Sequence, residues 1–175
     1  MKLIYKLLIL PFVFITSFTN AQKLESAFSS HYLGMNAGFS TGIGLSYRYW
    51  PSKLGVQVSC IPFKTEKSWN DLLNIKEIYK NYGIDVQDKK FISLGITGLL
   101  TIRQYERFNI FSYWGNHFLI QKKSTIYNSG CGIGFAVNRP FGFNLMVGYG
   151  VYDILDHVNL LPTIELGFFY HLRKI

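Results

Sequence analysis

Only one part of the sequence brings together side chains that could form a nucleophile and its base. His117 lies in the segment YWGNHFLI, and an alternating pattern places it on the opposite face from Ser112 of the same segment. A serine nucleophile needs a histidine within hydrogen-bonding reach, and the chain contains no His-x-Ser element. We therefore interpret His117 as a hydrogen-bonded interior side chain.

A second candidate is Glu165, the one acidic residue of a predicted strand that faces the same way as the small polar residues. A carboxylate removed from water needs a partner, so we expect Glu165 to pair with Arg48 or with another base on that face. The favoured role is a structural network of charges and hydrogen bonds. The alternative is a gate or selectivity element of a pore.

Two further patterns could bind ions. Asp153, Asp156 and His157 share one connection, but three residues without supporting ligands specify a metal poorly. The run 127–137, YNSGCGIGFAV, has glycines at every second residue. A phosphate-binding turn would require a helix after it, whereas the turn NRPF and another alternating segment follow. We predict no cofactor, no metal site and no nucleic-acid partner.

The start of the chain predicts export. Two lysines precede an apolar run over 7–18, and the small residue Ala21 precedes a cleavage point before Gln22. The run is shorter than the roughly 20 residues that a membrane-spanning helix needs. We predict a signal peptide over 1–21 and one domain over 22–175. The formal charge of the whole chain, +8, suits anionic surfaces such as lipid headgroups.

The elements that must position these residues are predicted strands. In 42–50, GIGLSYRYW, large apolar residues alternate with small or polar ones, as a period of two requires. Such segments recur with a turn or loop between them, and most are long enough to cross a membrane, which takes roughly 9 to 11 residues. The eight predicted strands are 32–39, 42–50, 53–63, 91–103, 107–120, 126–138, 141–152 and 163–173.

The two faces of these strands differ. One face carries most of the glycines and few charges, as in the interior of a narrow closed barrel, whereas the other carries Leu, Ile, Val, Phe and Tyr, as in contact with lipid. Closure would satisfy the edge hydrogen bonds that hydrocarbon cannot. The predicted interior polar network comprises Asn36, Arg48, Gln57, Asn109, His117, Asn128, Asn144 and Glu165.

The connections differ in length between the two ends of the predicted barrel. Short inner turns and longer outer loops are the expected asymmetry of membrane barrels, so the side with the longer connections is predicted to be external. The inner turns are 51–52, 104–106 and 139–140, and the external connections are 40–41, 64–90, 121–125 and 153–162.

The external segment 64–90 is the longest predicted connection of the chain and differs from the others in its sequence pattern. Ser68 followed by Asp71 forms a capping-box pattern before apolar residues at helical spacing, which predicts a short helix. The favoured role of this segment is a lid over the barrel mouth, because exposed apolar stripes are normally covered. The alternative role is binding of an extracellular partner or of the sugar-phosphate lipid of the outer leaflet. The predicted interaction residues of the loops are Trp69, Leu72, Lys76, Tyr79, Lys122 and Lys123.

The signal peptide, the eight two-faced strands and the final strand IELGFFYHL together resemble the small outer-membrane β-barrels of Gram-negative bacteria, the OmpA-like and OmpX-like group. The resemblance implies an all-β fold, an eight-stranded antiparallel up-and-down transmembrane barrel. It also implies insertion into the outer membrane by the barrel-assembly machinery and contact with lipopolysaccharide and phospholipid. We predict a non-enzymatic envelope or surface-interaction protein; the alternatives are an outer-membrane lipid-modifying enzyme and a narrow pore.

Overall fold

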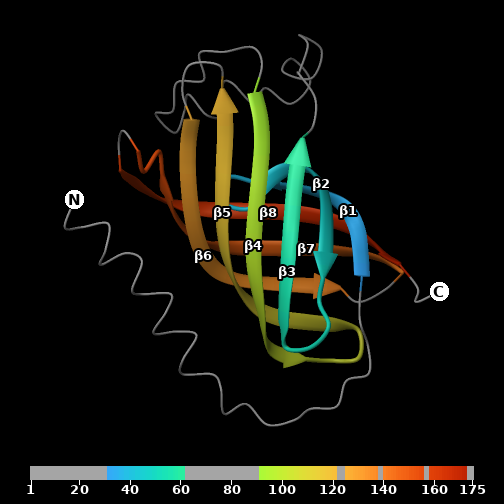
Figure 1. The fold of residues 1–175 in the computed structure, drawn as a ribbon. Helices are drawn as coiled ribbons and strands as arrows, with labels where there is room; N and C mark the ends of the chain where they lie inside the picture. The colour runs from blue at the N-terminus through green and yellow to red at the C-terminus, as the bar shows by residue number, and fades with distance from the viewer. Residues whose placement is uncertain (1–30, 62–90, 122–124, 138–139, 156–157, 173–175) are drawn as a thin grey trace.

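The computed structural model describes residues 31–61, 91–121, 125–137, 140–155 and 158–172, which form one closed antiparallel barrel (Figure 1). Each strand pairs with the next along the chain, and β8 pairs with β1. The predicted all-β, eight-stranded up-and-down barrel is confirmed. The strands are β1 His31–Gly38, β2 Gly42–Tyr49, β3 Leu54–Ile61, β4 Phe91–Gln104, β5 Phe108–Gln121, β6 Thr125–Val137, β7 Phe141–Tyr152 and β8 Asn159–Leu172.

Several predictions fall on residues that the structure does not describe. These are the signal peptide, the short helix within 64–90 and the six predicted interaction residues of the loops. The six residues are Trp69, Leu72, Lys76, Tyr79, Lys122 and Lys123.

The register explains how the alternating sequence closes on itself. β1 runs antiparallel to β8, with His31 opposite Leu172 and Ala37 opposite Leu166, so neither terminal strand of the sheet has a free edge. A bulge between Thr101 and Arg103 shifts the pairing of β4 with β5 near their connecting turn. Every described strand therefore hydrogen-bonds to a neighbouring strand on both of its edges. A sheet surrounded by hydrocarbon requires this, because no water is available to the backbone groups of a free edge.

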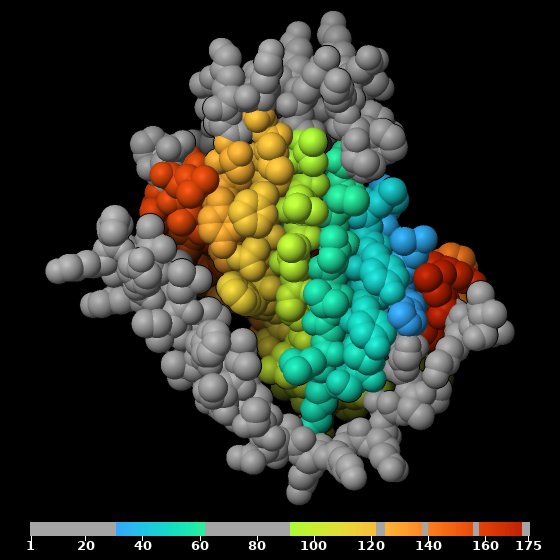
Figure 2. Space-filling view, viewed as in Figure 1, coloured from blue at the N-terminus to red at the C-terminus, as the bar shows by residue number. Residues whose placement is uncertain are grey.

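The outer face is largely apolar around the circumference of the barrel. The eight strands contain three charged residues, of which Arg48 and Glu165 point inward and Arg103 lies near the end of β4. Figure 2 shows the face formed by β3, β4 and β5 as a surface of close-packed side chains. Each strand exposes at least one large apolar side chain: Met35, Leu45, Val58, Ile96, Trp114, Ile133, Val147 and Leu166, from β1 to β8 in order.

Aromatic rings contact one another near both ends of the strands. At one end, Phe108 lies 5.0 Å from Phe135, and Phe141 lies 4.9 Å from Tyr170, between ring centroids. At the other end, Phe118 stacks on Tyr127 at 4.7 Å. Aromatic bands at two levels are typical of side chains that sit between an apolar and a polar medium.

The interior is layered, which the prediction of a polar interior did not anticipate. One apolar cluster, near the aromatic end that holds Phe108, includes Trp50, Phe111 and Met146, while a second around Leu119 lies toward the opposite end. Along β5 the polar contacts of His117 fall between Phe111 and Leu119. The physical reason is volume, because small side chains alone cannot fill an eight-stranded interior, and the Phe111 and Trp50 rings occupy the space above glycines.

Candidate functional site

The turn between β1 and β2 lies inside the barrel. Ser40 and Thr41 are completely buried, and backbone angles available mainly to glycine follow them, with φ at +88° in Gly42 and +122° in Gly44. The prediction grouped 40–41 with the connections at the external end of the barrel, and the structure shows that this connection folds into the lumen. The glycines let the hairpin bend inward, so that its tip occupies the lumen instead of the surface.

Glu165 of β8 anchors this turn. Its Oε1 accepts hydrogen bonds from the Ser40 backbone N–H at 3.2 Å, from the Ser40 hydroxyl and from the Thr163 hydroxyl at 3.1 Å, while its Oε2 accepts from the Thr41 hydroxyl. The expected pairing of Glu165 with Arg48 is wrong. The inserted turn supplies enough neutral donors to satisfy the carboxylate, and no arginine contacts it among the described residues.

Arg48 finds other partners. Its Nε and Nη2 both donate to Oε1 of Gln57, at 3.1 and 2.6 Å, and its guanidinium lies 4.1 Å from the centre of the Phe169 ring and 5.5 Å from that of Trp50. Aromatic faces attract a cation through their quadrupole, more strongly when water is excluded. Arg48 thus belongs to the apolar layer around Trp50, away from the carboxylate.

His117 and Ser93 form a buried pair that holds the other side of the turn. Because a carbonyl oxygen only accepts, His117 Nδ1 donates to the Phe39 carbonyl at 2.9 Å, which leaves Nε2 to accept from the Ser93 hydroxyl at 2.9 Å. Ser93 Oγ in turn accepts from the Ile43 backbone N–H at 3.0 Å. The chemistry of a Ser–His dyad is present, but both side chains are fully buried and bound to the turn.

Ser93 is a site residue that the sequence did not identify. The only serine tested as a partner of His117 was Ser112 of the same strand. The signal that identifies it is the register: Gly95 of β4 lies opposite His117 of β5, so Ser93 is the inward neighbour two residues away on the adjacent strand. The alternation of faces along one strand does not show which residues of the neighbouring strand lie beside it, so this diagonal pair could not be found without the strand pairing.

The structure places all eight residues of the predicted interior network inside the barrel, but it does not join them into one network. Asn36 donates to Thr41 Oγ1 at 2.8 Å, and Asn128 donates to the Phe39 carbonyl at 3.2 Å, so both hold the turn. Asn109 is buried near the Phe108 end, and neither amide atom of the buried Asn144 hydrogen-bonds within the described chain. The turn therefore collects Asn36, His117, Asn128 and Glu165, while Arg48 and Gln57 pair separately.

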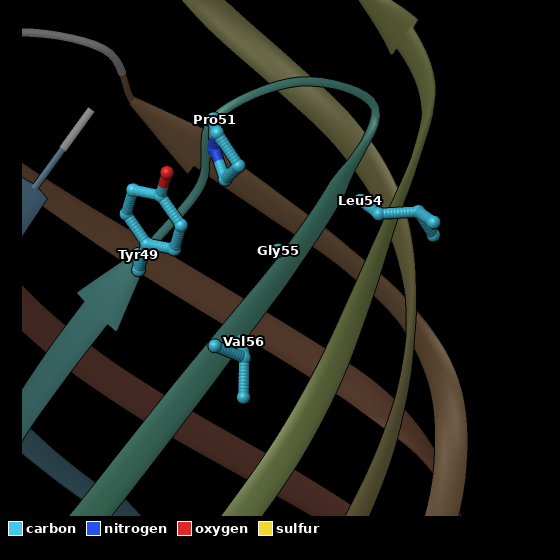
Figure 3. A pocket seen from close by; sticks show the side chains of 5 residues that line it. All are labelled: Tyr49, Pro51, Leu54, Gly55 and Val56. Atoms are coloured by element: carbon cyan, nitrogen blue, oxygen red, sulfur yellow. The ribbon is translucent and has the colours of Figure 1, made fainter. Parts of the chain in front are cut away.

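Other kinds of site are absent from the described residues. No group of three histidine, cysteine, aspartate or glutamate side chains is placed to hold a metal ion, and Asp156 and His157 lie outside the described ranges. No helix in the described chain has the length and hydropathy to span a membrane. On the outer surface, a shallow apolar notch lies at the turn from β2 to β3, where Figure 3 shows the ring of Tyr49 beside Pro51.

No protein-family model matches the chain, and no curated protein matches it. Among solved structures, the chain is similar to the Yersinia pestis outer membrane protein Ail in a phospholipid bilayer nanodisc, at 16% identity and a TM-score of 0.40, over 84% of this chain and all of that one. It is also similar to the S-type phycobiliprotein lyase CPES from Guillardia theta, at 9% identity and a TM-score of 0.23, over 86% of this chain and 90% of that one.

The space for the turn predicts how two glycines of β4 respond to the same substitution. A Cβ at Gly95 would press into the Thr41 backbone, whereas a Cβ at Gly98 would have no heavy atom nearer than 3.9 Å. We expect Gly95→Val to lower the free energy of unfolding by about 1 to 3 kcal/mol or more through overpacking. Gly98→Val is the matched control and should be neutral, since valine suits a strand. Urea unfolding followed by tryptophan fluorescence measures both; equal stability of the two variants would contradict the inserted turn.

The anchoring carboxylate gives a second prediction. Glu165→Leu leaves the Ser40 N–H and the Ser40, Thr41 and Thr163 hydroxyls without their acceptor. Each buried donor left unsatisfied costs about 1 to 3 kcal/mol, so we expect a loss of at least about 2 kcal/mol in the free energy of unfolding. Glu165→Gln keeps one acceptor oxygen and should lose less. A leucine variant as stable as the unmodified protein in the same unfolding assay would show that the turn does not depend on Glu165.

Proposed function

We propose that the chain is a non-enzymatic outer-membrane β-barrel whose lumen is closed by its own first turn, and that it acts in the cell envelope through its external loops and its lipid contacts. The observation that carries this proposal is the uncharged belt of exposed apolar side chains around the barrel. An apolar surface of this extent on a water-soluble barrel would promote association, because soluble monomers rarely expose large contiguous apolar patches.

The dimensions of the belt support a membrane location. Phe108 and Phe118, which stand in the two aromatic bands, are ten residues apart on β5. At about 3.3 Å per residue and a strand tilt near 40°, this separation corresponds to about 25 Å along the barrel axis. That is the height of the apolar band of outer-membrane barrels.

The filling of the lumen argues against the narrow pore. The inserted turn and the two apolar clusters occupy successive levels of the interior, and Trp50 lies against Phe111 at a centroid distance of 5.2 Å. An eight-stranded barrel whose interior is filled in this way leaves no continuous aqueous path. A lipid-modifying enzyme is the other alternative, and the Ser93–His117 pair lies inside, away from the surface where a lipid substrate would bind.

The remaining parts of the proposal rest on the sequence. A signal peptide over 1–21 would export the chain, and the barrel-assembly machinery would insert it. Lipopolysaccharide and phospholipid would surround the belt, and residues 64–90 would serve either as a lid or as a surface that binds an extracellular partner.

The gel mobility of the isolated outer-membrane fraction tests the proposal. A closed barrel resists detergent unfolding until it is heated, so we expect the unboiled protein to migrate at a position different from the boiled protein, and to fractionate with the outer membrane. Recovery of the protein as a soluble periplasmic species without a mobility shift would contradict the membrane location.

The two alternative functions have their own readouts. We expect no discrete conductance steps when the purified barrel is added to a planar bilayer, and no change in the lipid profile of cells carrying His117→Ala, provided that the variant keeps the mobility shift. Conductance steps that change with Glu165→Gln would favour the pore, and an altered lipid profile with a folded barrel would favour the enzyme.

A further inference from the structure

Two exposed basic side chains lie close together at the end of the barrel that is predicted to be periplasmic. Lys53 lies in the turn between β2 and β3, and Arg103 lies near the end of β4. Neither side chain forms an ion pair with a described residue. Both cations are therefore available to an anion outside the chain.

The bulge in β4 decides which way Arg103 points. Thr101 lies opposite the buried Phe111 and faces inward, so strict alternation would turn Arg103 inward as well. The bulge instead pairs Arg103 with Ile110, which faces outward beside Phe135 of β6. Bulges often serve to re-aim a side chain. The bulge thus makes Arg103 the one charged side chain of the described strands that points outward.

The guanidinium of Arg103 lies at the level of an aromatic band. Its central carbon is 5.3 Å from the centre of the Tyr105 ring, and Tyr105 stacks on Phe108 at 4.4 Å between ring centroids. Phe108 belongs to the band at this end of the barrel, through its contact with Phe135. Aromatic bands mark the depth of the lipid headgroups in a bilayer. If the barrel spans a membrane, as proposed above, Arg103 therefore lies at the depth of the lipid phosphates.

The start of β3 runs beside this part of β4. The Lys53 carbonyl accepts a hydrogen bond from the Thr101 backbone N–H at 2.8 Å, and Leu54 lies opposite Leu100. Directly after Lys53 comes the outer notch, which has a volume of about 240 Å³ (Figure 3). Its walls are apolar apart from one phenol, and the lining residues are Tyr49, Pro51, Leu54, Gly55 and Val56.

We propose that Lys53, Arg103 and this notch form a binding site for an anionic phospholipid in the leaflet on this side of the membrane. The two cations bind the phosphate, and an acyl chain lies along the notch. The proposal rests on the membrane location proposed above. A guanidinium matches a phosphate with paired N–H donors, and the Tyr105 ring limits the motion of the Arg103 side chain.

The adjacency of charge and apolar surface selects this ligand. A free phosphate would use the cations and leave the notch empty, whereas an uncharged lipid would use the notch and leave both cations without an anion. An anionic phospholipid carries both parts in the order in which the surface presents them, with the chain on the side of Val56 and the phosphate on the side of Lys53.

Native mass spectrometry of the full-length mature protein in detergent tests this site. The protein is titrated with phosphatidylglycerol or with phosphatidylcholine of the same chain length, and we expect tighter binding of phosphatidylglycerol. Arg103→Gln and Lys53→Gln should each weaken that binding about fivefold, the scale of one basic residue beside an anionic lipid. Lys122→Gln, in a predicted external connection, is the matched control for charge and should bind normally.

A second pair of variants tests the notch. Val56→Asn places an amide in the notch and should weaken phosphatidylglycerol binding, because the acyl chain would lie against a polar group. Val147→Asn is the matched control, since Val147 of β7 is exposed to a similar extent but lies outside the notch. The mobility shift on heating checks that every variant is folded.

Three results would overturn the site while leaving the barrel in the membrane. The first is equal affinity for the two lipids, and the second is an equal loss of affinity in Lys122→Gln. The third is displacement of the lipid by inorganic phosphate together with normal binding by Val56→Asn, which would show that the cations bind a free phosphate. Absence of the protein from the outer-membrane fraction would instead overturn the proposed function.

Discussion

The interior of this barrel depends on one buried carboxyl group, Glu165, that no cationic side chain contacts among the described residues. Glu165 is satisfied by a backbone N–H and three hydroxyls, all neutral, and two of its partner residues belong to the turn between β1 and β2. Four donors converge on this one side chain, and in a dry interior the loss of their acceptor is expensive. The carboxylate therefore fixes where the turn lies. The inserted turn leaves no room for a Cβ at the positions of β4, β5 and β6 that face it, which are therefore glycines: Gly95, Gly115 and Gly130.

The same alternation that builds the interior also builds the belt. Most inward glycines and serines are followed by a large outward apolar or aromatic side chain, so a lumen narrow enough to hold a turn and a surface apolar enough to face hydrocarbon arise from one pattern. Two outward positions on β5 and β6 depart from this pattern. Where β5 and β6 interrupt the apolar positions with Asn116 and Ser129, these side chains hydrogen-bond to Tyr127 and to the Gly115 carbonyl along the surface.

Much of this architecture follows from the sequence, because a period of two assigns each residue to a face without any knowledge of its neighbours. The predicted strands and the inward placement of Glu165 and His117 come from that rule, and closure comes from the need to pair the edge strands where no water is available. What it cannot give is which strand positions meet, so the Ser93–His117 pair required the register. The period also says nothing about residues of a turn, so the entry of Ser40 and Thr41 into the lumen could not be predicted from it.

The contact between Ser40 and Glu165 joins residues 125 positions apart, from the first hairpin to the last strand. The carboxylate that retains the turn is therefore supplied by the segment of the barrel that is synthesised last. Until β8 pairs with β1, the hydroxyls of the turn lack Glu165 as their acceptor, and the turn is held only through the Phe39 carbonyl by His117 and Asn128. Closure of the sheet therefore completes the hydrogen bonding of the turn, and a chain without β8 would have neither a closed wall nor the side chain that holds Ser40 and Thr41.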